Sequence, residues 1–210
     1  MLDIDMTLKG FGPEEAKKLD QAGRILKAVV NSEEFKNRVC SAHYYRSGKR
    51  YDGFYQCDLT PTEAYNRFMS GVDKFNKDAD DDIDIYITLY YSSGSVIGYT
   101  YGNTWHTWLN SKFLRLWWKT PQNIAGNLGH EYCHNVSGID KHTKKWTALR
   151  KYSAPYAIGY IVAELGEKYV TTEDITAPEI SGKYRVCRPR FRWFPWIFKK
   201  CKWVNKTRVV

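Results

Sequence analysis

The segment His130-Glu131-Tyr132-Cys133-His134 holds two histidines four residues apart, with a glutamate directly after the first. On a helix, residues four apart lie on the same face, so both imidazoles can reach one ion. Zinc binds imidazole nitrogen at about 2.0–2.1 Å, and such a pair supplies two of its ligands. Glu131 lies about 100° further round the helix, which places it to act on a metal-bound water as a general base rather than as a ligand. The spacing therefore predicts a zinc site with a general base beside it.

This motif resembles the zincin metallopeptidases, and in particular their metzincin branch. The metzincin pattern continues past the second histidine with x-x-Gly-x-x-His, and this chain departs from it: Ser137 stands at the glycine position, and Gly138 follows one residue later. The resemblance extends over about Val96–Ala163. It implies a zinc-dependent peptidase that hydrolyses a protein or peptide substrate, with Glu131 as the general base.

The resemblance leaves three residues open as the third zinc ligand beside His130 and His134. Strict spacing favours Asp140, which would match the small snapalysin-like group. Ligand chemistry favours His142, a softer nitrogen donor that fits if the loop carries two inserted residues. Glu164 ranks last, and would correspond to the glutamate that the gluzincin branch takes from a later helix.

Two further features follow from the resemblance. Metzincins carry a methionine-containing turn beneath the metal, but no methionine follows Met69 here, so Ser153–Ala157 is expected to replace that turn. Tyr156 is then either an oxyanion stabiliser or an ordinary packed tyrosine. An extended substrate would pair with an edge strand, for which Val96–Tyr101 and Trp105–Leu109 are the candidates.

Capping residues and hydrophobic spacing predict the elements that must position these side chains. Thr120 can cap the helix of the motif and Pro121 suits its first position, with Val136 near its end. Gly126 and Gly129 on this helix permit close packing against a neighbour. The other expected elements are helices at Pro13–Val30, after Ser32, from Thr60 to about Asn76 and at Tyr156–Tyr169, strands at Ile83–Tyr91, Val96–Tyr101 and Trp105–Leu109, and a loop at Gly48–Thr60. Helices, then strands, then helices predict an α+β fold, here a zincin-like domain with a small mixed sheet and an active-site helix.

Charge divides the chain into a domain at 1–182 and a basic, Trp/Arg-rich C-terminal extension at 183–210. The net charge is +9, yet the extension alone holds ten Lys or Arg and no acid, so the domain is close to neutral. Cations interleaved with large aromatic residues indicate packing on the domain, an anionic membrane surface or, less strongly, nucleic acid. The rival function is therefore a membrane- or nucleic-acid-binding protein acting through the extension, with a non-catalytic or structural zinc helix.

Apolar runs and cysteines bear on location. No run of 18 apolar residues is present, and Met1–Gly12 lacks the apolar core of a secretory signal, so we expect a soluble protein that is cytoplasmic or exported by a non-classical route. The cysteines at positions 40, 57 and 133 are scattered singly, which favours a reducing compartment. Cys187 and Cys201 have the placement to pair within the extension.

Overall fold

The structure of the chain is a computed structural model that describes residues 1–73, 82–101, 106–116, 120–170, 182–189 and 199–206. The chain forms two compact units, Met1–Val170 and Thr171–Val210. The elements are, in order, β1 (Asp3–Lys9), α1 (Pro13–Val30), α2 (Glu33–Cys40), β2 (His43–Arg46), β3 (Lys49–Asp52), α3 (Pro61–Met69), β4 (Asp82–Tyr90), β5 (Gly98–Thr100), β6 (His106–Asn110), α4 (Ser111–Leu114), α5 (Pro121–Cys133), η1 (Arg150–Tyr152), α6 (Ala154–Gly166), η2 (Glu167–Tyr169), β7 (Gly182–Pro189) and β8 (Lys199–Lys206).

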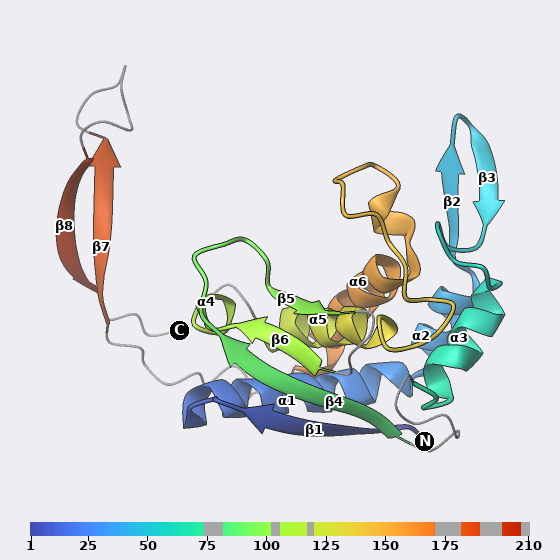
Figure 1. Ribbon diagram of the computed structural model, residues 1–210, viewed down its shortest axis with the longest axis horizontal. Coiled ribbons are helices and arrows are strands. Elements are labelled where there is room, and N and C mark those ends of the chain that lie inside the picture. Colours follow the sequence, from blue (N-terminus) through green and yellow to red (C-terminus); the bar gives the residue numbers. More distant parts are fainter. Residues whose placement is uncertain (74–81, 102–105, 117–119, 171–181, 190–198, 207–210) are drawn as a thin grey trace. The chain divides into compact units, whose positions relative to one another are not determined.

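The first unit is built on a four-stranded mixed sheet with the order β1-β4-β6-β5 (Figure 1). β4 runs parallel to both β1 and β6, whereas β5 runs antiparallel to β6. β5 therefore lies at one edge of this sheet. With six α-helices among the described residues, the expected α+β fold is confirmed.

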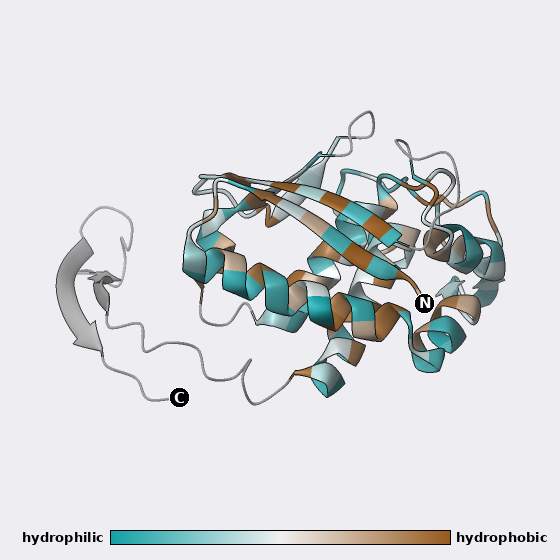
Figure 2. Cartoon of the chain, turned by 90° about the horizontal axis from the view of Figure 1, so that it is seen from below, coloured by the Kyte–Doolittle hydropathy of each residue, from teal (hydrophilic) through white to brown (hydrophobic). Residues whose placement is uncertain are grey.

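One face of the sheet is buried because apolar side chains alternate along its strands. In β4, Ile83, Ile85, Ile87 and Leu89 are buried, while Asp84 between them is exposed. β1 follows the same two-residue period, which the sequence-based prediction overlooked. Figure 2 shows this sheet lying over α1, with apolar residues on both layers.

Two glycines allow α5 and α6 to cross at backbone contact. A Cβ added at Gly126 would lie 2.6 Å from the carbonyl oxygen of Gly159, and one added at Gly159 would lie 2.8 Å from that of Gly126. Real Cβ atoms do not approach a backbone atom so closely, so glycine is required at this crossing. The close packing predicted for Gly126 is confirmed, and it brings the start of α6 against the end of α5.

Two sequence-based boundaries are wrong. α3 ends at Met69 instead of near Asn76, because Gly71 adopts a left-handed backbone (φ 68°) that ends helical geometry. Residues 74–76 of that expected helix lie outside the described part. The loop expected at Gly48–Thr60 begins with β3, which pairs with β2 in a hairpin.

The strand expected at Trp105–Leu109 is β6, and it lies inside the sheet between β4 and β5 rather than at the edge. Its first described residue is His106, since Trp105 lies outside the described residues. No helix within the described ranges is long and apolar enough to cross a membrane.

The second unit holds an antiparallel pair of strands, β7 and β8. Their register places Cys187 opposite Cys201. A disulfide bond between these two cysteines stays a prediction.

Candidate metal centre

The helix α5 carries the first histidine in its last turn and ends directly before the second. Thr120 is the N-cap residue and Pro121 opens the helix, as expected. The helix ends at Cys133, so His134 is its C-cap. Gly138 then adopts a φ of 92°, which reverses the chain and returns it toward the helix.

This reversal brings three histidines together. The ligand nitrogens of His130, His134 and His142 all lie within 4.8 Å of one another. Their ring centroids are 5.1 Å apart for His130 and His134, 5.3 Å for His130 and His142, and 4.9 Å for His134 and His142. Among the described residues, this is the group of His, Cys, Asp and Glu side chains that is close enough to hold one metal ion.

Backbone carbonyls orient the three rings. Nδ1 of His134 lies 2.8 Å from the carbonyl oxygen of Asp140, and Nδ1 of His142 lies 3.1 Å from that of Thr143. The backbone carbonyl of Pro155 faces His130 and acts to raise the pKa of that ring, as a hydrogen-bond acceptor does. When one ring nitrogen donates its hydrogen to a carbonyl, the other nitrogen carries the lone pair that a metal needs.

Burial keeps two of the histidines, His130 and His142, in the form that binds metal. It is the largest cause that holds the pKa of His130 well below its ordinary value, and the positive charges that His134 and His142 would carry add to the effect. Burial also lowers the pKa of His142. Both imidazoles are therefore neutral at neutral pH, which is the state required for coordination.

Glu131 lies beside this cluster with its carboxylate buried. The residue is 2% exposed, and burial raises its pKa from 4.5 to about 7, against the opposing effect of hydrogen bonding from Thr100 and Asn127. Asn127 Nδ2 lies 3.4 Å from Oε1, whereas Oε2 is buried without a hydrogen-bond partner of ordinary geometry in the described part of the chain. A carboxyl group with a pKa near 7 can both accept and release a proton at neutral pH.

Tyr156, from the first turn of α6, completes the wall of the cluster. Its ring centroid lies 4.5 Å from that of His130 and 4.9 Å from that of His142. The guanidinium of Arg150 lies 4.5 Å from the centre of the tyrosine ring. Burial raises the pKa of Tyr156, so its hydroxyl keeps its proton at neutral pH and remains a donor.

The two other candidates for the third ligand take different places. Asp140 acts on His134 through its backbone carbonyl, and its side chain is not part of the group that could hold one ion. Glu164 is also outside that group, because its carboxylate pairs with Arg38 at 2.8 Å. Of the three candidates, only His142 is brought to His130 and His134.

Sequence reasoning missed the residues that support the site from other elements. Thr100 comes from the sheet edge, and Arg150 precedes α6, with no spacing to the motif that could reveal either. Asn127 was visible, since it precedes Glu131 by one helical turn. The carbonyl of Pro155 could not be found from sequence, because any residue supplies a carbonyl.

The donor set fits zinc. Three imidazoles are a common protein ligand set for catalytic zinc, and nitrogen donors suit this ion better than calcium or magnesium. Two nearby thiols are directed elsewhere: Sγ of Cys57 lies 3.1 Å from the carbonyl oxygen of Gly138, and Sγ of Cys133 lies 3.2 Å from that of Gly129.

No family model and no curated protein matches this chain.

Proposed function

We propose that the protein is a zinc-dependent peptidase of the zincin type. The observation that carries this proposal is the convergence of three carbonyl-oriented histidines with a buried glutamate of pKa about 7. His130, His134 and His142 would hold the zinc, and three protein ligands leave a coordination position for water or substrate. Bound zinc would supply Lewis-acid polarisation of the scissile carbonyl and lower the pKa of the attacking water to about 7.

The chain's own residues supply the proton transfers. Glu131 takes a proton from the water as the oxygen of that water bonds to the carbonyl carbon. It then delivers that proton to the amide nitrogen as the carbon–nitrogen bond breaks. Both steps require a carboxyl group that changes protonation state readily near neutral pH, which burial of Glu131 provides.

Tyr156 and β5 are assigned the supporting roles. The tyrosine hydroxyl, held as a proton donor beside His130, would stabilise the negative oxygen that develops on the carbonyl. β5 is an edge strand of the sheet, and its Thr100 lies near Glu131, where it acts to lower the pKa of that carboxyl group. An extended peptide would pair with this edge and pass the general base.

The test is the variant Glu131→Gln, compared with the parent for zinc content and for hydrolysis of a quenched fluorescent peptide mixture. The side chain is not a ligand, so the variant should bind zinc like the parent. Loss of the base should slow hydrolysis by about 10²–10⁴-fold. Hydrolysis at the parental rate would show that Glu131 is not the base, and zinc-loaded parent without hydrolysis would favour a structural site.

A further inference from the structure

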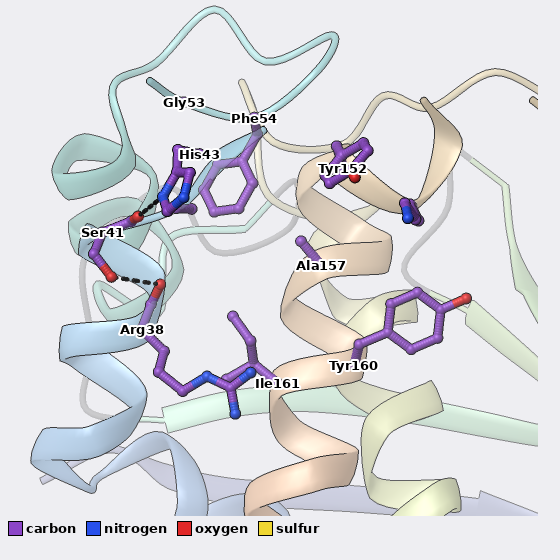
Figure 3. Close-up of a pocket in the computed structure, with 11 residues that line it drawn as sticks. Arg38, Ser41, His43, Gly53, Phe54, Tyr152, Ala157, Tyr160 and Ile161 are labelled. Atoms are coloured by element: carbon purple, nitrogen blue, oxygen red, sulfur yellow. Dashed lines mark hydrogen bonds between the residues drawn. The ribbon is translucent and has the colours of Figure 1, made fainter. Parts of the chain in front are cut away.

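A pocket of about 320 Å³ lies between α2 and α6 (Figure 3). Arg38 reaches into it from α2, and Tyr160 lies on the opposite side, on α6. The side chains that matter for its chemistry are three nitrogen-bearing groups and three aromatic walls: Arg38, His43, Lys151, Phe54, Tyr152 and Tyr160. Apolar surface forms most of the lining, and the three nitrogen-bearing groups interrupt it. Such a lining suits a ligand that has an apolar stem and an anionic end.

The charge in this pocket is only partly compensated. Arg38 bridges from α2 to α6 by pairing with Glu164 at 2.8 Å. Lys151 instead lies with Nζ 4.8 Å from the centre of the Tyr152 ring and has no carboxylate partner among the described residues. The pocket therefore keeps one positive charge available for an anion.

The segment that leads from the metal centre to the pocket adds to this charge. Residues 141–151 hold five Lys or Arg and no Asp or Glu. Of these five cations, only Lys141 has a carboxylate partner in the described part of the chain, Asp58 at 3.6 Å. The same segment contains His142 and ends at Lys151, so it joins the histidine cluster to the pocket along the chain.

The pocket and the histidine cluster share a wall on α6. Tyr160 follows Tyr156 by one helical turn, and their ring centroids are 6.1 Å apart. Tyr156 in turn contacts His130 and His142. A turn of helix advances about 5.4 Å and an extended peptide about 3.3 Å per residue, so a short stretch of peptide reaches from one to the other.

We propose that this pocket binds the carboxylate side chain of a peptide, and that the protein consequently prefers acidic peptides. The proposal rests on the proposed peptidase function for its substrate. The ammonium of Lys151 pairs with the carboxylate, and the rings of Phe54, Tyr152 and Tyr160 pack against the methylene groups that carry it. The charge of residues 141–151 attracts the same peptides to the pocket.

The test measures peptide binding by the full-length, zinc-loaded Glu131→Gln protein, which does not consume the ligand. The probes are labelled ten-residue peptides that are uncharged except for one test residue, which is Glu, Gln or Lys. The test residue is placed at each position of the peptide in turn, and binding is followed by fluorescence anisotropy. At one position, the Glu peptide should bind about tenfold more tightly than its Gln counterpart, and the Lys peptide should bind most weakly. Lys151→Glu, added to this protein, should reverse the order of the Glu and Lys peptides.

The matched control is Lys17→Glu. Lys17 is an exposed lysine of α1 that does not line the pocket and lies outside the segment 141–151. This variant changes the net charge by the same amount and should leave the preference intact. The basic extension is present in every variant, so its attraction for acidic peptides cancels from the comparison.

Equal binding of Glu and Gln peptides at every position, or an unchanged preference after Lys151→Glu, would overturn the pocket assignment. Hydrolysis is measured separately with the parent protein. Binding that depends on Lys151 without hydrolysis would uphold the pocket and overturn the peptidase. Hydrolysis without such a preference would do the reverse.

Discussion

Backbone carbonyls orient the three histidine rings of the proposed metal centre. His130, His134 and His142 use the carbonyls of Pro155, Asp140 and Thr143, respectively. A carbonyl survives substitution of its side chain, so the orientation of each ring depends on the path of the chain. Among single substitutions in this group, loss of a ligand should therefore matter far more than loss of the side chain behind it.

Zinc affinity should separate His142→Ala from Asp140→Ala. His142→Ala removes a nitrogen ligand, and we expect a loss of more than about 100-fold in affinity. Asp140→Ala keeps the carbonyl that holds His134, so the loss should stay below about tenfold, under the range typical of removed supporting side chains. Competition with a chromogenic chelator measures both. The reverse ranking would assign the third ligand to Asp140, as in the snapalysin-like group.

The buried carboxyl group of Glu131 should destabilise the metal-free protein at alkaline pH. Its pKa is about 7 in the folded chain against 4.5 for an exposed glutamate. The folded state thus binds more protons than the unfolded state between these values, so the free energy of unfolding falls as the pH rises from about 4.5 to 7.

Glu131→Gln removes this titration. We expect the metal-free variant to match the parent at pH 4 and to exceed its free energy of unfolding by about 3 kcal/mol at pH 8, as measured by urea unfolding. A difference that is the same at both pH values would show that the carboxyl group is not buried in this way.

At the scale of elements, the site depends on how closely α5 and α6 approach. α5 carries His130 and Glu131, while the start of α6 carries Pro155 and Tyr156. Their contact at Gly126 and Gly159 fixes the distance between these two sets. An added methyl group at either glycine must separate the helices, because it meets a backbone atom that cannot move alone.

Gly159→Ala should therefore reduce both stability and zinc affinity. We expect a loss of about 1–3 kcal/mol in the free energy of unfolding from overpacking. Zinc affinity should fall about tenfold as the carbonyl of Pro155 shifts from His130. Gly94→Ala is the control, since its Cβ would meet only the hydroxyl of Ser92. Unaltered zinc binding in Gly159→Ala would show that the helix crossing does not position the site.

The elements best predicted from sequence were those with strong local signals. Capping residues and Pro fixed the starts of α1, α3 and α5, and alternation of apolar residues revealed β4. The end of α3 was missed because Gly71 permits a helix as well as a turn, and only packing selects between them. The candidate metal ligands after the helix, Asp140 and His142, were visible in the sequence as residue types. The choice between them depended on the path of the loop that Gly138 reverses.

Thr100 illustrates what sequence could not provide. It contacts Glu131 only because β5 pairs with β6, and β6 in turn lies between β5 and β4. Such pairing joins residues that share no local pattern. A site assembled from a helix end, a loop and a sheet edge is thus predictable in its helix motif and not in its supports.

At the scale of the whole molecule, the histidine cluster and the basic C-terminal extension lie in different units. Every residue of the histidine cluster and its supports belongs to Met1–Val170, which has its own apolar core. The ten cations that follow residue 182 belong to Thr171–Val210. The peptidase proposal therefore requires only the first unit, and the proposed binding to an anionic membrane surface requires only the second.

Deleting residues 171–210 tests this division. We expect the truncated protein to keep zinc and to cleave small peptides at the parental rate, because no site residue is removed. Binding to liposomes that contain anionic lipid, measured by sedimentation, should be lost. Unchanged liposome binding would reject the membrane assignment, and loss of folded protein would show that the extension packs on the domain.

The most direct test of the proposed metal centre is an anomalous difference map at the zinc edge from crystals of the zinc-loaded protein. It should show one peak per chain, bonded to nitrogens of His130, His134 and His142 at about 2.0–2.1 Å, with Glu131 close by but not coordinated. A peak elsewhere, or one closed by a fourth protein ligand such as Asp140 or Cys57, would contradict the catalytic assignment.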